Sequence, residues 1–288
     1  MSTTSKHKCP ICFEDTYPYF SHNDFFGNEV ELMKCKNCGH GSYRNVWSQS
    51  HFDEIYGVQY AKDYLDSTET HNQRLEQYVL DLILLKEYLS QKIKVLDFGC
   101  SSGEYLDAMP GAWDKSGYEV NSKLVSILNS TRPRYSIYEK VSDIEECFDL
   151  ITLRGVIEHI PEFSILSELI SKQLKVGGIL YISATPDFSS PCAVEYKSDW
   201  GQIVAPEHIH QFTPASLQVL LSTCGLVLKG LYHPYIGTPY ENWEIDSQHY
   251  LENRGGISSF VNSNSKAVKS YKHPFPGNMM SAIFEKIV

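Results

Sequence analysis

Four of the chain's eight cysteines form two C-x-x-C pairs near its start, Cys9 with Cys12 and Cys35 with Cys38. Two such pairs supply the four thiolates of a tetrahedral zinc site, and in a cytosolic chain they bind metal more often than they form disulfides. A segment this short cannot bury a core alone, and zinc would supply about 10–16 kcal/mol toward folding. We therefore predict a structural zinc ion with no open coordination position. A pair of redox-active dithiols is the alternative, but the βαβ context that it requires is absent.

A second stretch, Lys94 to Leu106, reads KVLDFGCSSGEYL and allows two chemistries. Its residues 99–103 fit G-x-S-x-G, the turn that carries the nucleophile of serine hydrolases. That arrangement needs earlier strands and an earlier loop with oxyanion donors, and no HGGG-like segment precedes this turn. The alternative is a glycine-rich turn that binds a cofactor after the first strand of a parallel sheet. The position of the turn favours the cofactor.

Acidic residues support the cofactor interpretation. Asp97 ends the strand before the turn, and Gly99 and Gly103 let the backbone turn tightly before a helix. Glu119 stands at the end of a second strand, where a carboxylate accepts both hydroxyl groups of a ribose. Because the turn lacks G-x-G-x-x-G, a nucleoside without phosphates suits it better than a dinucleotide.

The elements that must position these residues alternate between strands and helices. Apolar runs predict strands at 92–99, 147–155 and 178–185, with helices at 121–130 and 163–174. Such alternation predicts an α/β fold, a mostly parallel sheet with helices on both faces. We expect three parts: a zinc ribbon at 1–45, an aromatic linker with an amphipathic helix at 46–92, and a cofactor-binding domain at 93–288 with an insertion at about 237–275.

The linker carries an aromatic stripe and an apolar helix face. Tyr56, Tyr60 and Tyr64 recur every four residues and would form one stripe on a helix. This stripe either packs the ribbon against the domain or forms a lid over a ligand pocket. The helix expected at 68–89 has one apolar face. Its members are Leu75, Tyr78, Val79, Leu82, Leu85 and Leu89.

The charge balance narrows the choice of partners. Lys and Arg number 25 against 35 Asp and Glu, a net charge of −10, and no basic cluster stands out to attract a phosphate backbone. The start of the chain has no apolar segment of the signal-peptide kind, and no run approaches the length of a membrane span. We expect a cytoplasmic protein that does not bind membranes and for which nucleic acid is a disfavoured partner.

Five motifs, in order, resemble those of class I S-adenosylmethionine-dependent methyltransferases. VLDFGCSSGEYL resembles the first motif of that family, GYEVN the second, and VSDIEE the segment after the third strand. FDLITLRGVIEHIPE and LKVGGILYISATPD resemble the fourth and fifth strands. The resemblance covers about residues 70–230 and the last strand, and Ser101 stands where the family often has glycine. It implies a Rossmann-like seven-stranded sheet whose last strand is antiparallel, with S-adenosylmethionine as cofactor.

The resemblance also implies a cofactor site. Asp97 and Gly99 would lie near the methionine end of the cofactor, Glu119 would bind the ribose, and Asp143 would bind the adenine amino group. Arg154, at the end of the fourth strand, would contact the donor or an anionic acceptor. The expected cofactor-binding residues are Asp97, Gly99, Cys100, Ser101, Gly103, Glu119, Val120, Asp143, Ile144, Arg154 and Gly155.

Histidines at strand ends and in loops are the candidate catalytic bases, because histidine titrates near neutral pH. His159 follows the fourth strand beside Glu158, where both could instead fix the loop by hydrogen bonds. Ubiquinone-biosynthesis O-methyltransferases carry E-x-x-E-H here for a divalent metal, but Gly155 replaces the first glutamate, which argues against a metal. His208 and His210, in APEHIHQFT, would share one side of an extended segment. Either they serve the reaction or they close a loop.

The whole chain resembles bacterial methyltransferases with an N-terminal zinc ribbon, which are often associated with sugar, polysaccharide or secondary-metabolite biosynthesis. We therefore expect methyl transfer to a small-molecule acceptor, a sugar or a nucleotide-linked sugar. An RNA methyltransferase that grips RNA with the ribbon is one alternative, although the acids of that segment have the wrong sign. They are Glu14, Asp15, Asp24, Glu29 and Glu31. The other alternative is a catalytically silent cofactor-binding module that mediates interactions.

Overall fold

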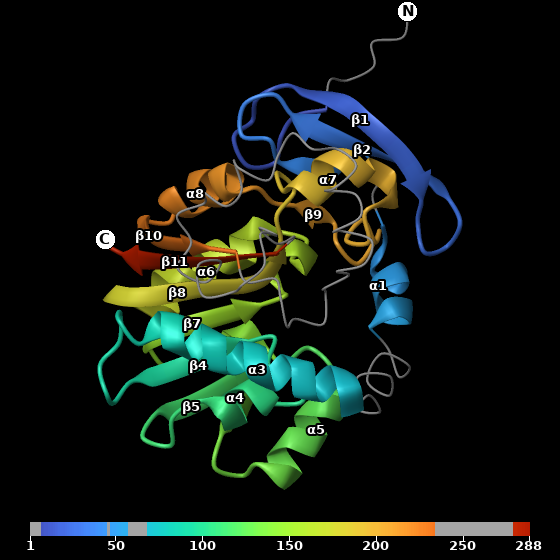
Figure 1. The fold of residues 1–288 in the computed structure, drawn as a ribbon. Coiled ribbons are helices and arrows are strands. Elements are labelled where there is room, and N and C mark those ends of the chain that lie inside the picture. Colours follow the sequence, from blue (N-terminus) through green and yellow to red (C-terminus); the bar gives the residue numbers. More distant parts are fainter. Residues whose placement is uncertain (1–6, 45–46, 57–67, 234–278) are drawn as a thin grey trace, which may run out of the picture.

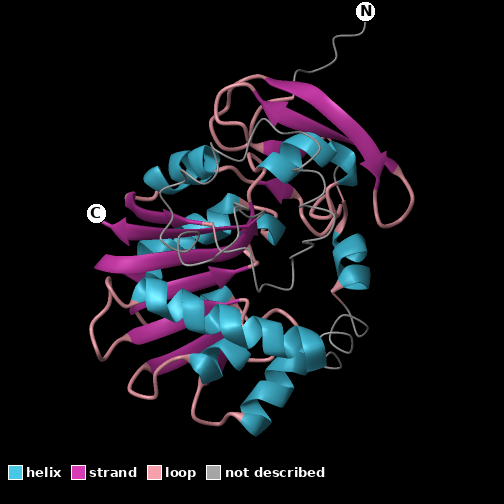
Figure 2. Ribbon diagram, in the orientation of Figure 1, coloured by secondary structure: helices cyan, strands magenta, loops and turns pink. Residues whose placement is uncertain are grey.

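The computed structural model describes residues 7–44, 47–56, 68–233 and 279–288 (Figure 1). A seven-stranded sheet forms the body of the described part, and a four-stranded sheet lies at one end of it (Figures 1 and 2). Tyr60, Tyr64 and the insertion expected at 237–275 lie outside the described residues. Within these ranges, no helix has the length and apolar character needed to cross a membrane.

The larger sheet has the strand order β10-β11-β8-β7-β4-β5-β6. Strand β11 runs antiparallel to β8 and to β10, whereas β4 pairs in parallel with β5 and β7. This arrangement is the Rossmann-like sheet of class I methyltransferases, and it confirms the predicted fold, including the antiparallel last strand. The strands are β4 (Lys94–Phe98), β5 (Asp114–Tyr118), β6 (Ser136–Tyr138), β7 (Phe148–Arg154), β8 (Leu174–Pro186), β10 (Leu226–Tyr232) and β11 (Met279–Lys286).

Helices cover both faces of this sheet (Figure 2). Successive strand residues point to opposite faces, so β4 places Val95 in one core and Leu96 in the other. Helices α3 (Thr68–Leu85) and α4 (Glu104–Ala108) pack on the Val95 side, and α6 (Phe163–Gln173) and α8 (Pro214–Ser222) on the Leu96 side. The other described helices are α1 (Gln49–Ile55), α5 (Ser122–Thr131) and α7 (Pro191–Tyr196), with the 3-10 turns η1 (Val141–Asp143), η2 (Ile157–His159) and η3 (Lys197–Asp199).

The smaller sheet contains one strand from far along the chain. Strands β1 (Thr16–Asn23), β2 (Glu29–Cys35) and β3 (Gly41–Tyr43) pair antiparallel in sequence order. The fourth strand, β9 (His210–Gln211), pairs antiparallel with β3. The sequence predicts residues 1–45 as a ribbon of their own, but the sheet of this ribbon is completed by the larger domain.

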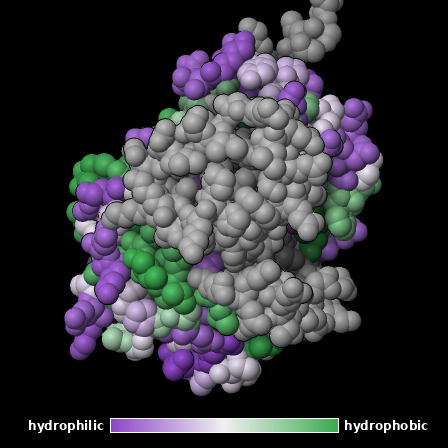
Figure 3. Space-filling model, in the orientation of Figure 1, coloured by the Kyte–Doolittle hydropathy of each residue, from purple (hydrophilic) through white to green (hydrophobic). Residues whose placement is uncertain are grey.

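Helix α3 buries most of the face that its apolar pattern predicts. Tyr78 and Leu85 are buried and Leu82 packs against the same core, whereas three apolar side chains are between 37% and 59% exposed. They are Leu75, Val79 and Ile83. Figure 3 shows the hydrophobic patch over this helix. The buried side of the helix also carries Gln77 and Asp81, which bond to Arg154 at the end of β7.

Candidate active site and metal centre

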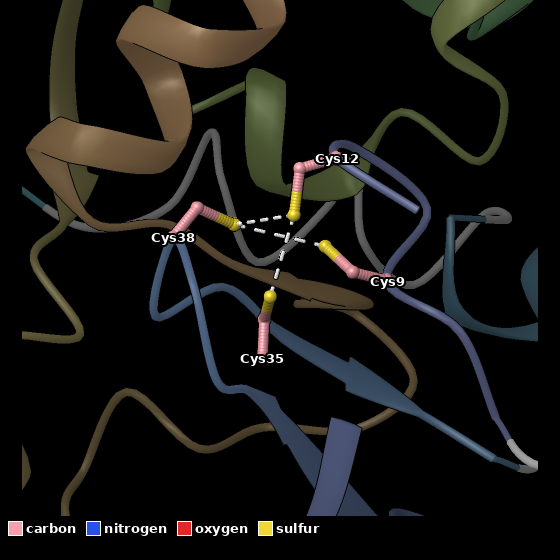
Figure 4. Close-up of side chains that lie close together, drawn as sticks. All are labelled: Cys9, Cys12, Cys35 and Cys38. Carbon is pink, nitrogen blue, oxygen red and sulfur yellow. Dashed lines mark hydrogen bonds between the residues drawn. The ribbon is translucent and has the colours of Figure 1, made fainter. Parts of the chain in front are cut away.

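The four cysteines of the C-x-x-C pairs converge on one point (Figure 4). Their sulfur atoms all lie within 4.8 Å of one another. The Sγ–Sγ distances are 3.7 Å for Cys9–Cys38, 3.4 Å for Cys12–Cys35 and 3.6 Å for Cys12–Cys38. A zinc ion with Zn–S bonds of about 2.3 Å places its tetrahedral sulfurs about 3.8 Å apart. The donor set and its spacing therefore fit one zinc ion, and the sulfurs are too far apart for disulfide bonds.

The second cysteine pair is held by its own backbone. The Cys35 N–H donates to the carbonyl of His40 at 2.8 Å, and the Asn37 N–H donates to Cys35 Sγ at 3.4 Å. Gly39 has a φ of 73°, in the left-handed region that glycine occupies without a steric penalty. This tight turn, residues 35–40, is called the metal knuckle below.

The glycine turn follows β4 at the carboxyl edge of the larger sheet. Gly99, Ser101 and Gly103 have φ angles of 83°, 48° and 79°. Ser101 thus occupies the left-handed region, which explains why glycine suits this position. A Cβ atom on Gly99 would lie 2.6 Å from Val156 Cγ2, so the absence of a side chain brings the turn against the loop after β7. Ser101 Oγ is buried and has no hydrogen-bond partner among the described residues, which leaves it available to a polar ligand group.

Two buried carboxylates flank this turn. Asp97 accepts a hydrogen bond from Thr152 Oγ1 at 2.6 Å, and burial raises the pKa of its carboxyl group to about 6. Glu119 accepts backbone N–H bonds from Ser101 at 2.9 Å and from Asn121 at 2.8 Å. Each Glu119 oxygen keeps a second lone pair, so the carboxylate can still accept ribose hydroxyl groups. The geometry fits a nucleoside.

The other expected cofactor residues differ in what they can offer a ligand. Val120 is 63% exposed, and the Asp143 side chain in η1 is also exposed, so both can touch a ligand at the edge of the sheet. Cys100 and Ile144 are buried in the two cores, which leaves only their backbone for a ligand. Gly155, with a φ of 61°, forms the turn after β7.

Arg154 is held by helix α3. Its Nε donates to Asp81 Oδ2 at 3.2 Å, and a second guanidinium nitrogen donates to Gln77 Oε1. Asp81 also accepts from Tyr181 Oη at 2.6 Å, and its carboxylate is fully buried. Burial raises the pKa of Asp81, and the positive charge of Arg154 opposes that shift. Gln77 and Asp81 could not be recognised from the sequence, because polar residues on an amphipathic helix ordinarily mark its exposed side.

Glu158, His159 and His208 form one group, with ligand atoms within 4.8 Å of one another. The two imidazole rings meet edge to face at 4.8 Å between centroids. His159 Nδ1 lies 2.8 Å from the carbonyl of Glu207, and His208 Nδ1 lies 2.8 Å from that of Gln202. A carbonyl only accepts, so each Nδ1 carries the proton and each neutral ring keeps its lone pair on Nε2.

Burial sets the protonation of this group. It lowers the pKa of His159 to about 3 and that of His208 to about 4, and it raises the pKa of Glu158 to about 8. Thr185 Oγ1 donates to Glu158 Oε2 at 3.1 Å and fixes the carboxyl group. At neutral pH the group thus combines two neutral bases with a protonated acid, the components of general acid–base catalysis.

Tyr56 connects this group to the glycine turn. Its hydroxyl lies 2.9 Å from His159 Nδ1, and its backbone carbonyl accepts from Asn121 Nδ2 at 3.0 Å. Asn121 is also the residue whose N–H binds Glu119. Tyr56 therefore links Asn121, the partner of Glu119, to His159, a contact that fits either of the two roles considered for this linker, packing or a lid. Asn121 was missed from sequence because its role depends on a contact 65 residues away in the chain.

The structure separates His210 from His208. His208 faces His159, whereas His210 Nδ1 lies 3.2 Å from His40 Nε2 on the metal knuckle, and both of these rings are buried. The expectation that His208 and His210 share one side is wrong because the extended strand begins only at His210, after a turn closed by the His208 N–H. A further histidine at the same edge of the sheet, His233, lies with its Nε2 3.1 Å from Asp187 Oδ2, just beyond the end of β8.

Comparison with known proteins bears on the family and the fold. A family profile described as "Methyltransferase domain" matches residues 70–229, more than half of the chain. No curated protein matches the chain.

Two solved structures of the plantazolicin methyltransferase BpumL are similar in fold. Its complex with SAH gives a TM-score of 0.51 at 16% identity, covering 83% of this chain and 93% of that chain. Its complex with SAH and a monoazolic desmethylPZN analog gives 0.51 at 14% identity with the same coverage. The YcgJ protein from Bacillus subtilis gives 0.48 at 16% identity, covering 72% of this chain and 97% of that chain.

Proposed function

Because the chain belongs to the methyltransferase-domain family, whose profile spans residues 70–229, we propose that it transfers a methyl group from S-adenosylmethionine to a small molecule. The proposed acceptor class is a sugar or a nucleotide-linked sugar. The observation that carries this proposal is the group of Glu158, His159 and His208, in which His208 meets the loop after β7 next to the glycine turn. It provides a base where an acceptor would meet the cofactor.

Three features of the turn support S-adenosylmethionine as cofactor. The buried Ser101 Oγ is free to bind a polar group, Glu119 keeps lone pairs for the ribose, and Asp97 places a carboxyl group where an ammonium would be favoured. When bound, the cofactor supplies a methyl group already activated on a sulfonium. We assign the backbone of residues 99–103 and the side chains of Asp97, Ser101, Glu119, Val120 and Asp143 to its binding, with Arg154 and Gly155 at the methionine end.

His208 is the proposed general base, and His159 supports it. The Nδ1–H of His208 is committed to a carbonyl, so Nε2 can accept a proton from the acceptor as its atom attacks in line. The depressed pKa keeps this ring neutral throughout the physiological range, so the lone pair on Nε2 stays available to an acceptor hydroxyl group. Protonated Glu158 supplies a hydrogen-bond donor in the same space. A hydroxyl-bearing acceptor such as a sugar matches this set of acceptors and donors.

A small acceptor is favoured over RNA by charge. The chain carries a net charge of −10, and the described part of the ribbon exposes the acids Glu14 and Glu29. For the cysteine cluster we propose a structural zinc ion held by Cys9, Cys12, Cys35 and Cys38, supported by their sulfur spacing. A cytoplasmic location, also proposed, keeps such thiolates reduced.

A divalent metal at Glu158, His159 and His208 is the second candidate role for that group. The mutual distances of the three ligand atoms favour it, whereas Gly155 provides no side chain as a further ligand. A chelator that leaves the four-cysteine metal in place distinguishes the two roles. Full methyl transfer after this treatment supports the base, and lost transfer restored by added Mg²⁺ or Mn²⁺ supports the metal.

The first test incubates the pure protein and methyl-labelled S-adenosylmethionine with size-fractionated extract of its source cell, with and without nuclease. A panel of nucleotide sugars is assayed in parallel. Nuclease-resistant label in small fractions or in a nucleotide sugar supports the proposal. Label that nuclease removes means that RNA is the acceptor. Cofactor binding without label in any fraction points to the silent interaction module.

A further inference from the structure

His40 is a fully buried histidine on the metal knuckle, and no step of the proposed reaction uses it. Its Nε2 lies 3.2 Å from His210 Nδ1, across the joint between the ribbon and the larger domain. The other ring nitrogens, His40 Nδ1 and His210 Nε2, are buried without a hydrogen-bond partner in the described part of the chain. Burying polar groups unpaired is unfavourable, and two apolar side chains would fill this space at a lower cost. A structural role of the contact between the two rings would explain why two polar side chains are buried here.

On one side, the knuckle is bonded to the segment that carries His208. The hydroxyl of Thr213 donates to the carbonyl of Cys38 at 2.8 Å, and Gln211 Nε2 donates to the carbonyl of His208 at 3.1 Å. A Cβ on Gly41 would lie 2.8 Å from Gln211 Cβ, so the two backbones of β3 and β9 approach as closely as glycine allows. The position of His208 is thus tied to the knuckle through its nearest neighbours.

On the other side, His210 contacts the loop that carries His159. Its ring packs on Phe163 at 4.4 Å between centroids, and Phe163 begins helix α6 directly after that loop. The backbone of Pro161 and Ile160 lies close enough to the His210 ring to oppose the effect of burial on its pKa. His40 packs on the same aromatic cluster through Phe163 at 6.4 Å. One ring pair therefore contacts both loops of the candidate base group.

We propose that His40 and His210 are positioning residues, through which the metal knuckle holds the two loops that carry His208 and His159. On this assignment the ribbon is a structural part of the active site and not a separate module. The inference rests on the proposed function, since that function gives the two loops their catalytic role, but the contact between the rings does not depend on methyl transfer. The metal of the knuckle is zinc in this proposal, because zinc fits the four thiolates.

The test replaces His40 by Phe, which keeps the aromatic ring and removes Nε2. His7→Phe is the matched control, because His7 lies two residues before Cys9 as His40 lies two after Cys38, and its Nδ1 bonds within the ribbon to Thr16 at 3.1 Å. Ring-nitrogen NMR of labelled histidines reports the tautomers of His208 and His159 without any acceptor. Binding of S-adenosylhomocysteine by calorimetry, and the absorption of Co²⁺ in the four-thiolate site, report the two other sites.

We expect His40→Phe to release the fixed Nδ1–H tautomers of His208 and His159, and His7→Phe to leave them as they are. Amide exchange over residues 202–213 should be faster by roughly threefold to tenfold, the factor expected for one lost hydrogen bond. His40→Gln, which keeps a side-chain nitrogen, should restore part of the wild-type spectrum. S-adenosylhomocysteine binding and the Co²⁺ spectrum should stay unchanged.

The proposal is overturned if His40→Phe, with Co²⁺ bound, leaves both tautomers and the exchange rates at wild-type values. Should that variant not fold, His210→Phe tests the same contact from the other side, and unchanged signals there overturn the proposal equally. Failure of the proposed function gives a different result, in which the wild-type protein does not bind S-adenosylhomocysteine while the effect of His40→Phe on the tautomers persists.

Discussion

Two pairs of histidines lie near one another and are held in different ways. In the pair of His159 and His208, each Nδ1–H donates to a backbone carbonyl, so each Nε2 keeps its lone pair beside the protonated Glu158. In the pair of His40 and His210, the rings bond to each other, one from the turn before β3 and the other from β9 of the same sheet. Burial is more complete in the second pair, and residue type is shared, so residue type does not mark a base. The partner of Nδ1 does, because it decides which nitrogen is free to take a proton.

The largest effect should follow from His208→Ala. If His208 is the general base, the variant should lower kcat with an identified acceptor by about 10²- to 10⁴-fold, the usual contribution of such a group. S-adenosylmethionine affinity should stay within about twofold of wild type, because the glycine turn is intact. Steady-state kinetics and calorimetry measure the two quantities, with His7→Ala as control. A kcat loss equal to that of the control would assign the base elsewhere.

His210→Ala should instead act mainly on stability. Removing a buried ring that packs on Phe163 leaves a cavity, and the free energy of unfolding should fall by about 2–4 kcal/mol. Urea unfolding measures this loss, and His208→Ala, which lies at the acid–base group, should lose less. If His210→Ala is as stable as wild type, the ring pair does not hold the ribbon to the domain.

Sequence alone reached the fold and the family because both depend on local patterns. The strand and helix periods predicted the sheet, and the order of motifs around Asp97, Gly99 and Glu119 predicted the cofactor turn. The four cysteines could be recognised from the sequence for the same reason, since the spacing within each C-x-x-C pair is local. The directions in which single side chains point could not be predicted from the sequence.

Asp81 and His210 show why the direction of a side chain could not be predicted. Asp81 sits on the buried side of α3, and its burial is made tolerable by the guanidinium of Arg154, 73 residues away, and the hydroxyl of Tyr181, 100 residues away. His210 is two residues from His208, but pairing with β3 turns it toward His40, 170 residues away. Both outcomes depend on contacts between distant segments, which periodicity along one segment does not contain.

A pH dependence separates the histidines from the cofactor carboxylate. Asp97 has a pKa raised to about 6, and a cationic ligand favours its charged form, so the pKa falls on binding. S-adenosylmethionine affinity should therefore be level above about pH 6 and fall up to tenfold per pH unit below it, about 1.4 kcal/mol per unit. His159 and His208, with pKa values of about 3 and 4, do not titrate in this window.

Calorimetry from pH 5 to 8 measures the effect, and Asp97→Asn should abolish the slope. A slope that persists in Asp97→Asn would assign the titration to another group.

The smallest effect should come from Tyr56→Phe, which removes the hydroxyl that lies 2.9 Å from His159 Nδ1. His159 keeps its bond to the carbonyl of Glu207, so the tautomer is retained, and the loss should be about 0.5–1.5 kcal/mol in transition-state stabilisation, or up to about tenfold in kcat. Tyr88→Phe, which loses a hydroxyl contact of 3.2 Å to Tyr232, is the control. If both variants lose the same free energy of unfolding and only Tyr56→Phe loses kcat, Tyr56 orients the base group. If kcat is unchanged, its contact with His159 only packs the linker, and the two histidine pairs differ less than their hydrogen bonds indicate.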